Sequence, residues 1–393
     1  MTDRSTELIQ KSAESALSAE EATALMGAQG PAMLDLLRAA CVLRDEAKGN
    51  RVTYSRKVFI PLTTLCRDDC GYCTFKRDPG QPGAKTLSPE EVLEIARRGK
   101  ARGCKEALFS LGDKPELRFP EAAAELARFG YKTTTDYLVA MCRLVLEETG
   151  LLPHPNPGTL GRHDLARLRE VSPSMGVMLE NVSPRMRQPG MAHEHAPDKV
   201  PGARVAMVRM AGELRIPFTT GLLIGIGETL RERVDTLLVI KRLQEAHGHI
   251  QEVIVQNFRA KPAIPMADWP DATLMELLRT IAVARLLLGG EMNIQAPPNL
   301  SPEVYPLLLL AGINDWGGVS PVTPDHINPE APWPEIQRLA QFSADAGYAL
   351  RERLCVYPEY IDRKPGFLSD GLRDAVLRQA DGEGYALAEE KYA

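Results

Sequence analysis

Short apolar runs rich in β-branched residues alternate with longer amphipathic stretches through most of the chain. A short apolar run bounded by turn residues is typical of a buried strand, whereas apolar residues at spacings of three and four are typical of a helix. Between the runs lie helical patterns, one of which begins at Ser88 with Glu91 completing a capping box. The pattern predicts eight strands, at residues 57–63, 106–111, 150–153, 174–180, 217–224, 252–257, 291–296 and 311–315.

Strands that alternate with helices in this way predict an α/β protein with a parallel (β/α)8, TIM-type barrel. An open, doubly wound parallel sheet fits the same periodicity and remains the structural alternative. We expect residues 1–50 to form an N-terminal helical extension and residues 51–335 the barrel. Residues 336–393 predict a C-terminal helical tail that packs on the barrel.

Composition narrows the classes of partner. The net charge of the 393 residues is −5, and no basic run of the kind that binds nucleic acid is present. No stretch approaches the roughly 18 uninterrupted apolar residues of a spanning helix, and the first twenty residues lack the apolar segment of a secretory signal. We therefore expect a cytoplasmic protein that binds a small molecule, with neither nucleic acid nor membrane as a partner.

Three of the seven cysteines stand close together directly after the first predicted strand. Cys66, Cys70 and Cys73 have the spacing C-x3-C-x2-C, and the other four cysteines are scattered. Thiolates are the usual protein ligands of iron–sulfur clusters, and three of them leave one iron of a cubane open for an exogenous ligand. We expect Cys104, Cys142 and Cys355 to be buried apolar residues.

Two other functions would each fit part of the cysteine pattern. A structural zinc site normally takes four protein ligands, and no second CxxC or histidine pair lies nearby in the sequence. A redox CxxC formed by Cys70 and Cys73 would leave Cys66 unexplained. The cluster is therefore the favoured interpretation, with zinc and redox chemistry as alternatives.

The cysteine motif, with Tyr72 as an aromatic residue before the third cysteine, resembles the signature of the radical S-adenosylmethionine (SAM) superfamily. This resemblance implies a radical SAM barrel with a 4Fe-4S cluster whose open iron binds SAM, which is cleaved to methionine and a 5′-deoxyadenosyl radical. Other motifs at strand ends resemble SAM-binding elements of that superfamily, although each also fits an ordinary turn, cap or solvated side chain. The implied cofactor-binding residues are Tyr72, Gly112, Asp113, Glu180, Asn181, Arg204, Gly225 and Glu228.

Longer segments resemble one family of that superfamily, the synthases of the deazaflavin FO, in particular their cyclising, CofG-type unit. These segments are YSRKVFIPLTTLCRDDCGYCTF, ETGLLPHPNPGTL, MLENVSPRM, VQNFRAKP, IQAPPNLSPE and GINDWGGVSPVTPDHINPEAPWP. The resemblance implies cyclisation of a hydroxybenzyl–ribityluracil adduct with loss of ammonia, in coenzyme F(420) biosynthesis. It also implies a partner radical SAM synthase that supplies the adduct and an electron donor such as flavodoxin or ferredoxin.

Alternatives to this activity stay open at the level of sequence. The nearest is the tyrosine-cleaving partner synthase, and biotin-synthase-like chemistry is a further radical SAM reaction. A non-catalytic 4Fe-4S electron carrier is the alternative from a different class, although such modules are usually short and have four cysteines. With one cysteine triad, we expect a single unit and not a fused enzyme.

Polar residues near the ends of the late predicted strands are candidates for binding a substrate with many hydrogen-bonding groups. Asp315 and His326 are the candidate catalytic residues; we expect replacement of Asp315 to spare SAM cleavage and stop FO formation, and His326 to shuttle protons. His193 and His195 lie in a proline-containing loop and are expected at the surface. The alternative for the polar residues near the strand ends is that they build turns and cap helices. The candidate substrate-binding residues are Gln256, Asn257, Gln295, Asn299, Asn314, Ser320, Asp325 and Asn328.

Overall fold

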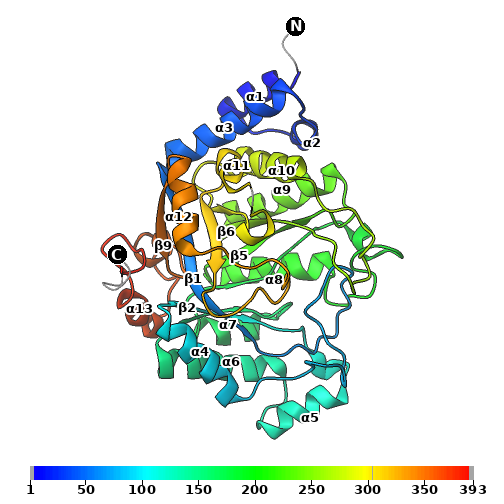
Figure 1. Cartoon of the computed structure of the whole chain (residues 1–393), viewed down its shortest axis with the longest axis vertical. Helices are drawn as coiled ribbons and strands as arrows, with labels where there is room; N and C mark the ends of the chain where they lie inside the picture. The colour runs from blue at the N-terminus through cyan, green and yellow to red at the C-terminus, as the bar shows by residue number, and fades with distance from the viewer. Residues whose placement is uncertain (1–3, 303, 389–393) are drawn as a thin grey trace.

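Eight parallel strands form a nearly closed barrel in the computed structural model, which describes residues 4–302 and 304–388 (Figure 1). Hydrogen-bonded neighbours follow the order β3-β2-β1-β8-β7-β6-β5-β4. The circle is completed where β3 lies beside β4, and there His154 Nδ1 is 2.7 Å from Ser174 Oγ. The predicted (β/α)8 fold is confirmed, and the open sheet is wrong. The strands are β1 Arg51–Pro61, β2 Glu106–Ser110, β3 Leu152–Asn156, β4 Met175–Gly176, β5 Phe218–Ile224, β6 Ile250–Asn257, β7 Ile294–Gln295 and β8 Asp315–Val319.

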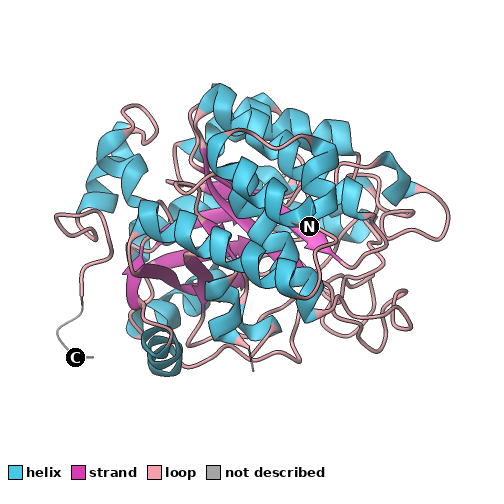
Figure 2. Ribbon diagram, turned by 90° about the horizontal axis from the view of Figure 1, so that it is seen from above, coloured by secondary structure: helices cyan, strands magenta, loops and turns pink. Residues whose placement is uncertain are grey.

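Amphipathic helices surround the strands, and the long loops gather at one end of the barrel (Figure 2). Capping boxes begin α4, α9 and α10, at Ser88, Thr229 and Thr273. Both faces of the strands are covered, so β5 is buried along its whole length. The helices that follow β1 to β6 are α4 Pro89–Ala101, α5 Pro120–Arg128, α6 Thr134–Thr149, α7 Arg162–Arg169, α8 Pro201–Glu213, α9 Leu230–His247 and α10 Leu274–Leu288, with α11 Tyr305–Leu310 between β7 and β8.

Three N-terminal helices lie outside the barrel, where α2 packs on α9 and α3 packs on α10 and α11 (Figure 1). They are α1 Arg4–Glu14, α2 Ala19–Leu25 and α3 Pro31–Lys48. Within the part of the chain that the structure describes, no helix combines the length and the apolar character needed to span a bilayer.

The last strand of the barrel differs from the sequence prediction. The predicted strand 311–315 is wrong, because β8 begins at Asp315, where that strand was expected to end. The apolar residues before it form a buried turn after α11, and the Arg44 side chain donates to the Ile313 carbonyl. The strand itself contains Gly317 and Gly318, residues that usually indicate a turn.

The C-terminal segment contains a strand that the prediction of a helical tail missed. This strand, β9 Ala349–Arg353, pairs in parallel with the first half of β1, beside the part of β1 that pairs with β2. Around it lie α12 Ile336–Asp345, a π-helical turn at Glu359–Arg363 and α13 Asp370–Leu377. The segment therefore closes the end of the barrel opposite the long loops.

Arg353, the last residue of β9, holds two carboxylates inside the barrel. Its Nε donates to Asp315 Oδ2 at 2.6 Å, and an Nη donates to Glu252 Oε1 at 2.9 Å. All three side chains are almost fully buried. Burial alone would lower the pKa of Arg353, but the charge of Asp315 raises it well above its ordinary value. Buried charges are tolerated only when paired in this way, so the cluster fixes β9 to β6 and β8.

Asp315→Asn is expected to lower the free energy of unfolding by about 3 to 5 kcal/mol, because it leaves the buried Arg353 charge without its main partner. The measurement is equilibrium denaturation by urea. Arg351→Gln is the matched control on the same strand, since Arg351 is half-exposed and its ion pair with Asp381 lies at the surface; its cost should stay below about 1 kcal/mol. Equal losses in the two variants would contradict this account of the Arg353 cluster.

Candidate active site

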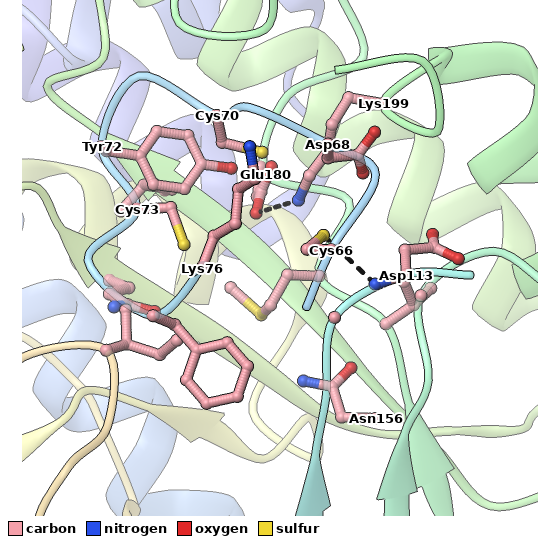
Figure 3. Close-up of a pocket in the computed structure, with 18 of the residues that line it drawn as sticks. Cys66, Asp68, Cys70, Tyr72, Cys73, Lys76, Asp113, Asn156, Glu180 and Lys199 are labelled. Atoms are coloured by element: carbon pink, nitrogen blue, oxygen red, sulfur yellow. Dashed lines mark hydrogen bonds and ion pairs between the residues drawn. The ribbon is translucent and has the colours of Figure 1, made fainter. Parts of the chain in front are cut away.

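The loop after β1 carries three thiols into a cavity at the carboxyl ends of the strands (Figure 3). Cys66, Cys70 and Cys73 all line this outer cavity, whose volume is about 240 Å³. Catalytic groups of parallel barrels gather at this rim because each strand delivers its following loop there. The motif therefore lies where the sequence analysis expects chemistry.

The turn after β2 fits closely against the first cysteine. The Asp113 amide donates to Cys66 Sγ at 3.2 Å. A Cβ on Gly112 would lie 1.9 Å from the Leu65 carbonyl oxygen and 2.7 Å from the Cβ of Cys66. Only glycine permits this approach, which gives Gly112 a steric function in shaping the cysteine loop.

A second loop, residues 188–199 after β4, binds the cysteine loop along its backbone. Asp69 N–H donates to the His195 carbonyl at 2.9 Å, and Gly71 N–H donates to the Ala192 carbonyl at 2.8 Å. The side chains of Arg67 and Asp198 form a two-pronged ion pair between the same two loops. The positions of the thiols are thus set by contacts outside their own loop.

The donor set fits a cluster and not a single zinc ion. A tetrahedral zinc with Zn–S bonds of about 2.3 Å needs its sulfurs roughly 3.8 Å apart. The three cysteine sulfurs do not all lie within 4.8 Å of one another, and the described residues add no fourth cysteine or histidine to them. Three thiols spread around a cavity, with the closely packed turn at Gly112 beside them, match a cubane held at three irons.

Burial makes the Cys66 and Cys70 thiols poor nucleophiles on their own. It raises the pKa of Cys66 to about 12 and that of Cys70 well above the ordinary value. Such thiols stay protonated at neutral pH, and metal coordination is what removes the proton from a ligand thiol. A redox CxxC would need Cys70 as a reactive thiol, so free redox chemistry is disfavoured there relative to metal binding.

Glu180 is the centre of a charged network on the cavity wall. It takes the left-handed backbone conformation, with φ of 60°, and its Oε1 lies 2.7 Å from Lys199 Nζ (Figure 3). His193 Nε2 lies 3.0 Å from Glu180 Oε2 and 3.2 Å from the Tyr72 hydroxyl. Burial alone would raise the pKa of Glu180, but Lys199 and His193 hold it well below its ordinary value. Glu180 is therefore a fixed carboxylate facing the cavity.

Arg204 on α8 lines the same cavity and is buried, with two of its N–H groups donating to the Met178 carbonyl. Asp113 lines it as well, and its carboxylate lies within 4.8 Å of those of Asp68 and Asp198. Burial raises the pKa of Asp68 to about 6. Tyr72, Gly112, Asp113, Glu180 and Arg204 are thus brought together as the sequence analysis expected.

Three other expected cofactor-binding residues do not line the cavity. The carboxylate of Glu228 accepts the N–H groups of Gly225 and Ile226, each at 2.9 Å, so Glu228 stabilises its own turn. Asn181 Oδ1 accepts the Ser183 N–H. Asn181, Gly225 and Glu228 thus have a structural function in adjacent turns, and their contact with the cofactor stays a prediction.

A second, inner cavity of about 180 Å³ lies in the barrel interior and shares wall residues with the outer one. Gln256 and Asn328 line both cavities, as does Asn156 at the end of β3. Among the other candidate substrate-binding residues, Asn257 lines the outer cavity, and Gln295 and Asp325 line the inner one.

Asn299 and Ser320 support the neighbouring loops instead of lining a cavity. Asn299 Nδ2 donates to Asp325 Oδ2 at 2.9 Å, and Ser320 Oγ lies 2.9 Å from Thr323 Oγ1 in a turn. The Asn299 contact orients Asp325, whose side chain faces the inner cavity.

Asn314, Asp315 and His326 are not where the sequence analysis expected them. Asn314 and Asp315 lie at the start of β8, and Asn314 is held by Arg285 at the end of the barrel away from the cysteines. Asp315 is fully buried against Arg353 and lines neither cavity, a placement that favours a structural function over a catalytic one. His326 packs edge-on against Phe75, with ring centroids 6.4 Å apart, and lines neither cavity.

The expectation for His193 was wrong, because its side chain is 2% exposed and contacts Glu180, whereas that of His195 is 71% exposed, as expected. Lys199 and Asn156 were also missed. The charged residues of the segment HEHAPDKV could have indicated that His193 and Lys199 lie at a functional site. Asn156 was missed because the predicted third strand ended three residues too early. Cys104, Cys142 and Cys355 are buried, as expected.

The barrel and the cysteine site are those of a radical SAM protein. In agreement, the family model of the radical SAM superfamily matches residues 60–240. Two solved structures share the fold. The FeFe-hydrogenase maturase HydG from Carboxydothermus hydrogenoformans has a TM-score of 0.73 at 19% identity, over 95% of this chain and 89% of that one. Methylornithine synthase PylB has a TM-score of 0.66 at 20% identity, over 88% of this chain and 97% of that one.

Curated relatives narrow the class to one family. The 7,8-didemethyl-8-hydroxy-5-deazariboflavin synthase of Methanopyrus kandleri is 52% identical over 335 residues, which are 85% of this chain and 99% of that protein. The FO synthase of Mycobacterium leprae is 51% identical over 93% of this chain. The chain spans only 44% of that longer protein. The chain belongs to the FO synthase family of radical SAM enzymes.

Replacing Cys66, Cys70 or Cys73 with alanine is expected to reduce iron and sulfide after anaerobic reconstitution to near background, because a cubane held by two protein thiolates is not retained. The measurement is iron and sulfide per chain together with the visible absorption of the cluster. Cys142→Ala is the matched control, since Cys142 is buried on α6 away from the cavity. A Cys73→Ala protein with a full cluster spectrum would contradict the assignment.

Gly112→Ala is expected to reduce cluster loading at least several-fold although it removes no ligand, because the new methyl group would meet backbone at 1.9 Å. Gly161→Ala provides the control, since a Cβ there meets nothing within 4 Å and the φ of −87° suits alanine. The same iron assay and a circular dichroism spectrum separate loss of the cysteine geometry from unfolding. A normal cluster content in Gly112→Ala would show that the packing of Gly112 against the cysteine loop does not constrain the thiols.

Proposed function

We propose that this chain is the cyclising FO synthase unit, with 5-amino-5-(4-hydroxybenzyl)-6-(D-ribitylimino)-5,6-dihydrouracil as its substrate. The observation that carries the proposal is the match over 99% of a relative that is named for the deazariboflavin product. The reaction closes the third ring of the deazaflavin and releases the 5-amino group as ammonia. It belongs to the ammonia-lyase class of radical SAM reactions.

Cys66, Cys70 and Cys73 would hold the 4Fe-4S cluster, and bound SAM would supply a 5′-deoxyadenosyl radical that removes one hydrogen atom from the substrate. Glu180, with Lys199 beside it, offers a fixed charged wall for the polar parts of SAM. The neighbouring apolar cluster around Tyr72 offers a surface for its adenine. A charged wall beside an apolar surface suits the two ends of this cofactor and supports the proposal.

The residues shared by the two cavities indicate where the reacting carbon of the substrate would lie. Asn156, Gln256 and Asn328 line both cavities, so a substrate in the inner cavity would face SAM in the outer one across these residues. Their amides can orient the uracil ring through hydrogen bonds without taking part in proton transfer. After the hydrogen atom leaves, ring closure, loss of one proton, loss of one electron to the oxidised cluster, and loss of ammonia would complete the reaction.

Two partners follow from the proposal. The adduct must come from a synthase that joins a tyrosine-derived hydroxybenzyl group to a ribityluracil, and the cluster must be reduced by a small electron carrier such as flavodoxin or ferredoxin. The inner cavity argues against a simple electron carrier, since electron transfer needs no second chamber lined by polar side chains. The tyrosine-cleaving activity is the alternative that the experiment must separate.

The test is anaerobic reaction of the reconstituted protein with dithionite, SAM and the adduct, with 5′-deoxyadenosine followed by chromatography and FO by fluorescence. We expect both products to appear together. 5′-Deoxyadenosine formed with tyrosine and ribityluracil, but no FO from the adduct, would replace the proposal by the tyrosine-cleaving activity. A loaded cluster that cleaves no SAM with either substrate set would overturn both and leave the electron carrier.

A further inference from the structure

The floor of the inner cavity is charged, which is unusual for the interior of a barrel. Side chains that point inward from the strands usually form apolar layers in this fold. Here the layer nearest the closed end contains Lys57, Glu106, His154, Thr219 and Glu252, and all five line the cavity. Above them the lining becomes apolar, with Phe59, Leu108 and Ile254 each two residues further along their strands.

The floor groups are held in place by one another. Lys57 Nζ lies 2.8 Å from Glu106 Oε1, and Thr219 Oγ1 donates to Glu252 Oε2 at 3.0 Å. Burial alone would raise the pKa of Glu106, but Lys57 holds it at about 2, and burial lowers the pKa of His154 to about 4. At neutral pH the Glu106 carboxylate, which is ion-paired with Lys57, therefore shares the floor with the neutral imidazole of His154.

Two adjacent glycines of β8 make room for polar side chains inside the barrel. A Cβ on Gly318 would lie 1.8 Å from Lys57 Cε, and a Cβ on Gly317 would lie 2.0 Å from Gln295 Nε2. The Gly-Gly pair of the GINDWGG segment is therefore explained by two long polar side chains that cross β8 inside the barrel. Burying Lys57 costs free energy that an apolar residue would not, so the fold alone does not account for it.

We propose that the inner cavity binds the substrate with its ribityl chain on this floor and that Lys57 is a principal contact of the ribityl hydroxyls. The assignment rests on the proposed function and adds the orientation of the substrate. Each hydroxyl of a polyol both donates and accepts, which suits a floor with charges of both signs. The two cations of the lining, Lys57 and Arg353, are matched by Glu106 and Glu252, so the floor has no excess of positive charge to attract an anionic group.

The upper walls suit the other parts of the same molecule. Phe59 and Trp333 are stacked, with centroids 5.2 Å apart and planes at 19°, and both line the cavity. A flat ring system can lie against this pair while its polar chain reaches Lys57. The ring would then meet the shared wall at Asn156 and Gln256, which faces the cysteine cavity. This orientation brings the rings, and not the chain, to the radical.

The experiment measures binding of the fluorescent product FO, and of an FO analogue with a methyl group in place of the ribityl chain, to the cluster-loaded protein without reductant. Lys57→Met is expected to weaken FO binding by roughly 10-fold or more, as for loss of a charged hydrogen-bond partner. The methyl analogue should change by less than about 2-fold, since that contact is absent from it. The expected result is thus a loss of discrimination between the two ligands.

Lys241→Met on the outer face of α9 is the matched control and should change neither affinity. Lys57→Arg, which keeps the charge, should restore part of the discrimination, and iron content with SAM cleavage reports an intact barrel. Equal weakening of both ligands by Lys57→Met, or no weakening, would overturn the assignment. Coupling of Lys57 to the phenol hydroxyl, tested with an analogue that lacks it, would also overturn the orientation.

These outcomes are separate from failure of the proposed function. If the wild-type protein makes no FO from the adduct, the proposed function is wrong. If it makes FO, yet Lys57 does not discriminate between the two ligands, only the orientation is wrong.

Discussion

Closure of the parallel barrel is the constraint on which the rest of this structure depends. All strands run the same way, so every loop that follows a strand meets at one rim, and alternate side chains of every strand meet inside. The inward positions of β1 and β2 illustrate the result, because Lys57 and Glu106 lie at one level, with Phe59 and Leu108 above them. The interior is therefore graded, from a charged floor through an apolar middle to a polar rim.

The rim shows how a long loop can place metal ligands. The cysteine loop has little regular structure of its own, yet its backbone is bound by residues 188–199 after β4 and by the turn at Gly112. Met266 N–H adds a hydrogen bond to the Gly71 carbonyl from the loop after β6. Three loops from separate strands thus hold the thiols, and a site of this kind is preorganised only in the completed barrel.

The features predicted correctly are those that depend on a few consecutive residues of the sequence. The cysteine spacing, the capping boxes and the apolar runs of β2, β5 and β6 are each contained in a few consecutive residues. The failures concern contacts between distant segments. Gly317 and Gly318 indicate a turn in the sequence, but in the barrel they leave space for the Gln295 and Lys57 side chains. His193 was expected at the surface, but it is buried against Glu180. Asp315 follows an apolar run in the sequence, but its partner Arg353 is 38 residues away.

The C-terminal segment closes one end of the barrel and also contributes to the lining of the inner cavity. Arg353 of β9 lines the inner cavity and also donates to Glu252, a floor residue. Glu252 in turn accepts a hydrogen bond from the Tyr357 hydroxyl at 3.2 Å. Without β9, Glu252 and Asp315 would both lose the guanidinium that binds them, and buried carboxylates that lose such a partner are strongly destabilising. The charged floor and the segment that closes the barrel therefore require each other, which makes the polar chamber a property of the whole chain.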